Sequence, residues 1–224
     1  MNYVKKTLLV ICVLMTSWLL WAEESPISNF EIEESANSIL IKKYIGKEEK
    51  VIIPEKIKGK PVTEISWELF IDCSIRENIT ELILPDTVKE IESYAFSNLK
   101  SLTKVKLPSK ITNIYLGLFQ DCTSLTDIEI PNNVVEIGSG AFYGCTSLKY
   151  IKFPESLERI NRGAFQDCIS IETLTFPKKL AEISGDAFSG CDSLETVNYA
   201  GAEEDCDWLY DFGPFVKVNY DYKK

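Results

Sequence analysis

Apolar and polar residues in the middle of the chain recur with a fixed period of 23 residues. Three columns share this period. They are Phe96, Phe119, Phe142, Phe165 and Phe188; Pro85, Pro108, Pro131, Pro154 and Pro177; and Ile91, Ile114, Ile137, Ile160 and Ile183. Three independent columns with one period do not arise by chance, so the chain contains an internal structural repeat.

The pattern inside one unit predicts two short extended segments joined by a tight turn. Ile151 and Phe153 alternate with the polar-side residues Tyr150 and Lys152, which is the period of a strand. A second apolar pair begins each unit and marks another extended segment. The motif Ala-Phe-x-x-Cys between the segments has the spacing of one α-helical or 3₁₀ turn, and the proline after the strand ends it.

A unit of this size cannot bury its own apolar side, so successive units must stack. Strands of neighbouring units then form a ladder with a rise of about 4.8 Å per unit. Equivalent Phe, Ile and Leu residues become continuous internal columns, and each fully buried side chain contributes about 1.5–3 kcal/mol before the ordering entropy is counted. The predicted fold is therefore an α/β-type solenoid, a right-handed superhelix of short strands with short helical or 3₁₀ turns.

The repeat divides the chain into four expected segments. Residues 1–22 are a signal peptide, 23–61 an N-terminal cap with the opening turn of the array, 62–202 six repeats, and 203–224 a C-terminal cap. The first repeat, from Val62, has three extra residues, which predict a bulged loop.

Two elements are expected in the caps. Ser38–Tyr44 has the pattern of a strand. The aromatic tail is expected to form a short acidic helix and a last strand over Phe215–Tyr222; the alternative is an aromatic docking surface for a partner.

The consensus L-x-x-I-x-x-x-A-F-x-x-C-x-x-L-x-x-I-x-x-P over residues 62–202 resembles the BspA-like, or Treponema pallidum-type, leucine-rich repeats. Val51–Ile65 resembles the usual first turn of such arrays. The resemblance implies a leucine-rich-repeat superhelix that binds other molecules without catalysis. It also implies a bacterial surface or secreted protein, because several members of the family are implicated in adhesion to host proteins or other cells.

The N-terminus predicts export. Lys5 and Lys6 precede the apolar run Thr7–Trp21, which is too short for a comfortable membrane span, and Ala22 supplies a small residue for cleavage. An uncleaved N-terminal anchor is the alternative. The expected location is secreted, cell-surface or periplasmic, with no membrane span after removal of the signal.

Charge and composition narrow the function. The net charge is −10, or −12 without the signal segment, which argues against nucleic-acid binding. The absence of histidine excludes Ser-His-Asp and Cys-His catalysis and argues against a catalytic zinc site. Asp127 and Glu129 could be taken for a glycosidase pair, but solvated ladder carboxylates are the favoured interpretation. The sequence predicts no enzyme, catalytic residue, metal ligand or cofactor.

The cysteine column has a structural interpretation. Cys122, Cys145, Cys168 and Cys191 are 23 residues apart, with Cys73 and Leu99 at the same position of earlier units. Export makes disulfides chemically feasible, but residues of one column point the same way, whereas metal ligands must converge. Buried small apolar side chains fit better. The predicted core ladder is Phe96, Phe119, Phe142, Phe165, Phe188, Cys122, Cys145, Cys168 and Cys191.

The solvent-facing positions of the strands are the candidate binding surface. They are Lys104, Lys106, Asp127, Glu129, Tyr150, Lys152, Thr173, Thr175, Thr196 and Asn198. Opposite charges are expected side by side at Lys104 with Asp127 and along Lys106, Glu129 and Lys152, where they could equally serve only to fix strand register. Tyr150 is the expected main contact, because exposed tyrosines often anchor interfaces.

The favoured function is a non-catalytic scaffold for protein–protein interaction or adhesion. A host matrix or envelope protein is the expected partner, and a glycan is the second choice. The alternative is a structural, self-associating envelope protein.

Overall fold

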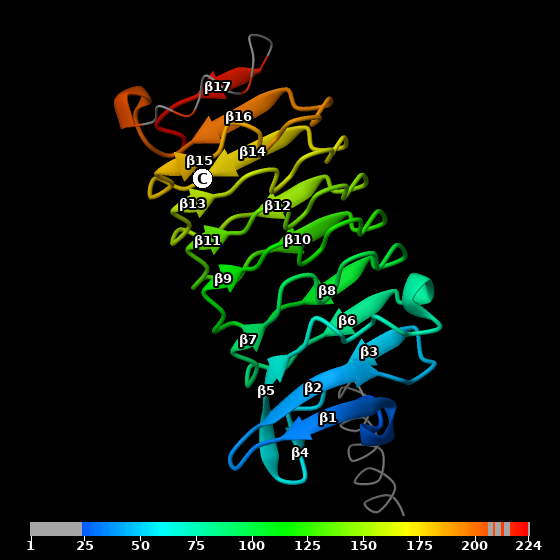
Figure 1. Ribbon diagram of the computed structural model, residues 1–224. Coiled ribbons are helices and arrows are strands. Elements are labelled where there is room, and N and C mark those ends of the chain that lie inside the picture. The colour runs from blue at the N-terminus through cyan, green and yellow to red at the C-terminus, as the bar shows by residue number, and fades with distance from the viewer. Residues whose placement is uncertain (1–23, 206–207, 209–211, 213–215, 224) are drawn as a thin grey trace, which may run out of the picture.

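The computed structural model describes residues 24–205, 208, 212 and 216–223 (Figure 1). The predicted signal peptide and Cys206 lie outside these residues. The described chain winds as a solenoid whose coils stack from the N-terminal to the C-terminal end, and each coil of the repeat region contributes one strand to each of two parallel ladders (Figure 1).

The first ladder contains the strands that the alternation of apolar and polar residues predicts. Its members are β3 (Lys50–Ile52), β6 (Glu81–Ile83), β8 (Lys104–Lys106), β10 (Asp127–Glu129), β12 (Tyr150–Lys152), β14 (Thr173–Phe176), β16 (Thr196–Tyr199) and β17 (Lys217–Asn219). Strand pairing is parallel within β3-β6-β8, β10-β12 and β14-β16-β17.

The second ladder contains the other extended segment of each coil. Its members are β2 (Ile39–Tyr44), β5 (Lys60–Ile65), β7 (Glu90–Ile91), β9 (Asn113–Ile114), β11 (Glu136–Ile137), β13 (Arg159–Ile160) and β15 (Glu182–Ile183). Pairing is parallel along β2-β5-β7 and along β9-β11-β13-β15. Glu136 lies opposite Arg159, one 23-residue period later, so the sequence period is also the register of the ladder.

The turns between the ladders differ from the sequence-based expectation. Their amides bond between coils: the N–H of Phe142 donates to the carbonyl of Ala164 in the next coil, while that of Cys145 closes a tight turn onto Phe142. An amide that donates to the next coil cannot also form the i to i−4 hydrogen bond of an α-helix. The described residues contain three 3₁₀ helices and no α-helix, so the fold is a β-solenoid, and the predicted turn of each repeat is present only as single hydrogen bonds of the 3₁₀ type, such as the one from Cys145 to Phe142.

The three 3₁₀ helices lie outside the regular turns. They are η2 (Ile27–Asn29), η3 (Arg76–Asn78) and η4 (Glu203–Asp205). The second of them, η3, lies in the long loop of the unit with three extra residues. The extra length is therefore absorbed there, away from the two ladders.

An antiparallel hairpin covers the N-terminal end of the solenoid. It joins β1 (Phe30–Glu34) to β2, which realises the strand expected at 38–44. A second hairpin joins β4 (Lys56–Ile57) to β5. The ring of Tyr44 lies between Phe30 and Phe70, with centroid distances of 5.5 and 5.9 Å. These aromatic contacts shield the first coil from water.

The C-terminal end is covered by β17 and an aromatic cluster. The expected last strand is shorter than predicted, and the expected short acidic helix is the 3₁₀ helix η4. Trp208 is buried against Phe176 and Tyr199, at centroid distances of 5.5 and 5.2 Å. Trp208 thus shields the last coils and is not exposed for docking.

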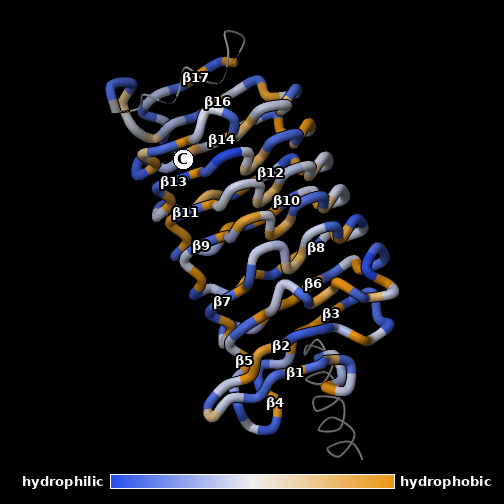
Figure 2. The backbone as a smooth tube through the Cα atoms, viewed as in Figure 1, coloured by the Kyte–Doolittle hydropathy of each residue, from blue (hydrophilic) through white to orange (hydrophobic). Residues whose placement is uncertain are grey.

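The phenylalanine column is the spine of the core. Phe119, Phe142 and Phe165 are fully buried, and their rings lie nearly parallel at centroid distances of 5.3 and 5.0 Å. Phe188 continues the stack at 5.1 Å but is only half-buried, because the side chain of Phe212 lies beyond it in place of another coil. Figure 2 shows hydrophobic residues returning at equivalent places in successive coils.

The cysteine column lies beside the phenylalanines. The Sγ of Cys145 donates a hydrogen bond to the carbonyl oxygen of Phe119 at 3.1 Å, and Cys168 does the same to Phe142. Cys122 and Cys191 repeat this contact, and all four are free thiols. Burial raises the pKa of Cys122 and Cys191 to about 12. A protonated, buried thiol that donates a hydrogen bond to a carbonyl oxygen helps to hold adjacent coils together. Such a thiol is unreactive, because the thiolate is the nucleophile.

Candidate binding surfaces

The outward positions of the first ladder form two rows, which together are called the strand face. The register places Asp127 opposite Tyr150 and Glu129 opposite Lys152. The exposed members are Lys104, Lys106, Asp127, Glu129, Tyr150, Lys152 and Thr173, and the half-buried ones are Thr175 and Thr196. Tyr150 projects furthest, with 73% of its surface exposed.

The charges on the strand face pair differently from the prediction. Glu129 and Lys152 form the expected ion pair. Lys104, however, pairs with Glu81 at 2.7 Å instead of with Asp127, whose carboxylate accepts from the hydroxyl of Thr126. The physical reason is the strand order: β8 is hydrogen-bonded to β6 along its length, whereas β10 is paired with β12.

The prediction that Asn198 belongs to the exposed face is wrong. Only 7% of its surface is exposed, because β17 adds a further strand beside β16. Its Nδ2 donates to Thr175 Oγ1 at 3.3 Å, and its Oδ1 accepts from Asn219 Nδ2 at 2.7 Å. Asn198 therefore belongs to a polar ladder that joins the last strands, and the strand face ends before it.

Glu81 is the best-paired carboxylate of the first ladder. Lys104 and Lys50 approach it at 2.7 and 3.0 Å from the strands on either side. The hydrogen bond from Lys104 is the main reason that the pKa of Glu81 lies below its ordinary 4.5, against the opposing effect of burial. Glu81 therefore stabilises the fold while it is ionised.

We expect Glu81→Gln to lower the free energy of unfolding by about 1 kcal/mol at neutral pH. The folded pKa is depressed, so the contribution is present above the unfolded pKa and is lost as the pH falls through the folded one. The difference between variant and parent should thus shrink in acid. Urea titrations at pH 7 and pH 3 measure it, with Glu172→Gln as an exposed control; a difference that grows in acid would contradict the ion-pair role.

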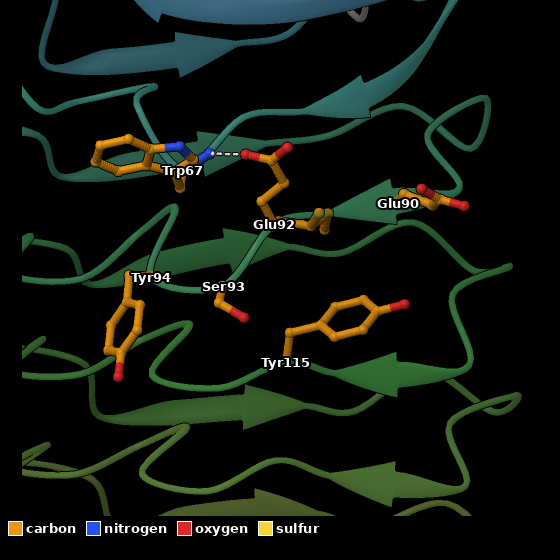
Figure 3. A pocket seen from close by; sticks show the side chains of 7 residues that line it. Trp67, Glu90, Glu92, Ser93, Tyr94 and Tyr115 are labelled. Carbon is orange, nitrogen blue, oxygen red and sulfur yellow. Dashed lines mark hydrogen bonds between the residues drawn. The ribbon is translucent and has the colours of Figure 1, made fainter.

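A second surface, not anticipated from the sequence, lies beside β7. It is a groove of about 540 Å³ and is called the aromatic groove. Its lining residues are Trp67, Glu90, Ile91, Glu92, Ser93, Tyr94 and Tyr115. Figure 3 shows the three aromatic side chains coming from three successive coils, with Glu92 and Ser93 between them. The exposed fractions of Trp67, Tyr94 and Tyr115 are 50, 42 and 38%.

Tyr94 has a backbone conformation that is unusual for a bulky residue. Its φ is 64°, in the left-handed region that glycine tolerates best. The same position holds glycine in the next three coils, at Gly117, Gly140 and Gly163, each with positive φ. The ring of Tyr94 lies against Gly117, where an added Cβ would approach its Cε1 to 2.1 Å. Glycine at 117 therefore leaves room for the Tyr94 ring.

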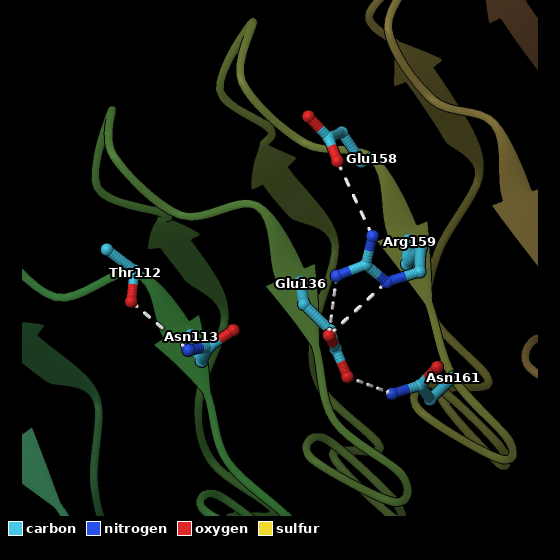
Figure 4. Close-up of polar contacts among 6 residues, drawn as sticks. All are labelled: Thr112, Asn113, Glu136, Glu158, Arg159 and Asn161. Atoms are coloured by element: carbon cyan, nitrogen blue, oxygen red, sulfur yellow. Dashed lines mark hydrogen bonds and ion pairs between the residues drawn. The ribbon is translucent and has the colours of Figure 1, made fainter.

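A polar cluster on the second ladder has a structural role (Figure 4). Arg159 pairs with Glu136 at 2.9 Å across β11 and β13, and Asn161 donates to the other Glu136 oxygen at 2.7 Å. The hydrogen bond from Arg159 lowers the pKa of Glu136. Because both oxygens of Glu136 are paired with side chains of the next coil, this cluster fixes strand register.

No group of three or more histidine, cysteine, aspartate or glutamate side chains in the described part of the chain could hold a metal ion. No helix within the described ranges is long and apolar enough to cross a membrane.

The stacked coils and the repeated columns define a leucine-rich-repeat solenoid. Residues 63–195 match the family described as "BspA type Leucine rich repeat region" in six copies, so the chain belongs to this family and the resemblance noted in the sequence is confirmed. None of the curated proteins compared with the chain matches it.

Solved structures with the same architecture come from several bacteria. The leucine-rich-repeat protein of T. pallidum is 27% identical, with a TM-score of 0.64 over 79% of this chain and 86% of that one. A leucine-rich cell surface protein from Faecalibacterium prausnitzii is 26% identical, with a TM-score of 0.61; 80% of this chain is covered but only 55% of the relative. The pneumococcal vaccine antigen PcpA, 21% identical with a TM-score of 0.60, covers 82% and 51% and shares the fold.

Proposed function

We infer that this chain is an exported, non-catalytic scaffold that binds a partner protein through the strand face. The observation that carries the proposal is the exposure of Tyr150 at the centre of a rigid, charge-patterned ladder. Aromatic anchors surrounded by polar groups are typical of the contacts that dominate protein interfaces. The main chain of the ladder is fixed by hydrogen bonds to neighbouring coils, so little ordering entropy opposes binding there.

Export is supported by the N-terminal sequence and by the relatives. One structural relative is described as a cell surface protein, and it and this chain share the repeat fold over most of this chain. That relative is longer than this chain, so its own activity does not transfer. An exported location would bring the strand face into contact with matrix, serum or envelope proteins.

Action as a separate molecule is favoured over self-assembly. β17 is the outermost described strand at the C-terminal end, and Lys217 on it is exposed. A lysine on an outer strand disfavours pairing of that edge with a second copy, because its charge would have to be desolvated. The net charge of −10 adds a general repulsion between copies.

We expect Tyr150→Ala to abolish detectable partner capture while leaving the melting temperature unchanged, because the side chain contributes contact area without contributing to the core. Immobilised protein is exposed to matrix, serum and envelope extracts, and the captured proteins are identified by mass spectrometry. Lys152→Glu, which reverses one charge on the face, should weaken the same capture.

The matched control is Tyr222→Ala, which removes another exposed tyrosine near the C-terminal end. Capture that survives Tyr150→Ala and Lys152→Glu but is lost in Tyr222→Ala would place the binding surface elsewhere. If no captured protein requires Tyr150 for its binding, the proposed role of the strand face is refuted.

A further inference from the structure

The aromatic groove is separate from the strand face, and the stability of the fold does not explain it. Trp67, Tyr94 and Tyr115 together expose an apolar surface that the core does not use. Concentrated exposed aromatic surface on a monomeric protein usually marks an interaction site. Tyr94 adds a backbone cost, since a bulky residue with a φ of 64° occupies a position held by glycine in the next three coils. Such strain typically persists where a residue is kept for function.

The charged residues that line the groove are all negative. Among the residues that the structure describes, Glu90 and Glu92 are the only charged ones that line it. Glu92 Oε2 accepts from the backbone N–H of Trp67 at 2.8 Å and from Ser66 Oγ at 3.2 Å, which holds the carboxylate at the backbone of Trp67 (Figure 3). Glu90 is exposed, and within the described ranges its carboxylate has no hydrogen bond or ion pair. The groove therefore presents two carboxylates among its three aromatic side chains.

The neighbouring strand increases the negative potential. The pairing of β5 with β7 puts Glu64 directly opposite Glu90, and like charges in such a position destabilise a sheet. Further along the same column, Arg159 lies between Glu136 and Glu182 and balances them. Glu90 has no such arginine in the next coil, where the equivalent position holds the neutral residue Asn113. A cationic ligand would relieve this repulsion.

The chemistry selects the kind of cation. A guanidinium group can stack on an indole or phenol ring and pair with a carboxylate at its edge, and both interactions strengthen when the group is partly desolvated. Trp67 and Tyr94 also line an adjoining apolar depression of about 380 Å³ with Phe70, Ile71, Arg76, Ala95 and Ser97. An apolar side chain next to the cation would fit there.

The spacing of the rings suits an extended chain. Trp67, Tyr94 and Tyr115 come from three successive coils, so the groove spans roughly 10 Å along the ladder at about 4.8 Å per strand. Three residues of extended peptide cover about the same length. We propose that the aromatic groove binds an extended, arginine-bearing segment of a partner protein, with the guanidinium between the rings and Glu90.

The test measures the affinity of the full chain for a defined peptide. The probe is a fluorescein-labelled nine-residue peptide in which arginine alternates with serine and proline, and binding is followed by fluorescence polarisation. We expect saturable binding that weakens with added salt. Trp67→Ala and Glu90→Gln should each weaken it by about tenfold or more, since one removes the ring and the other only the charge. The same peptide with glutamate in place of arginine should not bind.

Two further variants separate a binding role from a structural one. Tyr94→Gly installs the residue found at this position in the next three coils, so we expect weaker binding with no loss in melting temperature. Tyr150→Ala should leave the peptide affinity unchanged. The groove and the strand face can thus fail independently: loss of partner capture by the strand face would leave the peptide result standing, and the reverse also holds.

Three results would overturn the proposal. The first is an absence of saturable binding by the arginine peptide. The second is equal affinity in the parent and Trp67→Ala. The third is displacement of the peptide by a neutral cello-oligosaccharide together with no effect of Glu90→Gln, which would make the groove a glycan site instead.

Discussion

Replacing Phe142 with alanine is expected to lower the free energy of unfolding by about 3–5 kcal/mol. The ring is fully buried and stacks on Phe119 and Phe165 at 5.3 and 5.0 Å, so its removal opens a cavity with aromatic walls on both sides. Each coil is supported only by its neighbours, which means that the damage at one coil weakens two interfaces. Guanidinium unfolding followed by circular dichroism measures the change.

Lys152→Ala is the matched control for the phenylalanine column. Lys152 lies in the same repeat but on the outer side, where it and Glu129 are both largely exposed. An exposed ion pair contributes little, so we expect a change within about 0.5 kcal/mol. Equal losses of stability for the two substitutions would contradict the assignment of inner and outer positions.

Thiol labelling of the three central cysteines of the column should be very slow in the native protein. Cys122, Cys145 and Cys168 are fully buried, and burial raises the pKa of each thiol. A reagent therefore cannot reach these thiols, and almost none of each is present as the reactive thiolate. Reaction then requires opening of the fold. With a stability of about 5 kcal/mol or more, labelling of native protein should be at least about 1000-fold slower than in guanidinium.

Peptide mapping by mass spectrometry after a maleimide pulse gives the rate at each site. Cys73, which is only half-buried, should react before the three central thiols. Cys191, next to the half-buried last phenylalanine of the column, should react sooner than Cys145. Equal rates at Cys73 and Cys145, or oxidised cysteines in the freshly purified protein, would show that the column is not a set of buried free thiols.

The periodic part of the sequence is sufficient to predict the solenoid and its two ladders. Columns that recur at one spacing report on contacts between like positions, so the burial of Phe142 and Cys145 follows from repetition alone. The absence of α-helical turns could not be predicted, because Ala-Phe-x-x-Cys suits a helix locally, whereas amides of this motif bond to the next coil. The burial of Asn198 depends on β17, a strand outside the repeat. No single repeat unit contains that information.

The aromatic groove was missed for the opposite reason. Trp67, Tyr94 and Tyr115 are departures from the pattern, so the recurring residues give no sign of them. A signal was present: these turn positions hold bulky residues in the first three units, whereas the three later units have glycine, serine or other polar residues there. Departures from a repeat are where an array of this kind acquires a specific surface.

The repeated stacking of the phenylalanine spine also allows the length of the molecule to change in fixed steps. Phe119 stacks on Phe142, and Phe142 on Phe165, with nearly parallel rings, so a duplicated unit such as residues 111–133 would be joined by the same kind of ring contact. Every such insertion would move Tyr150 away from Trp67 in a step of about 4.8 Å. The distance between the two surfaces could thus be matched to the distance between two binding segments of a partner by duplication of repeat units alone.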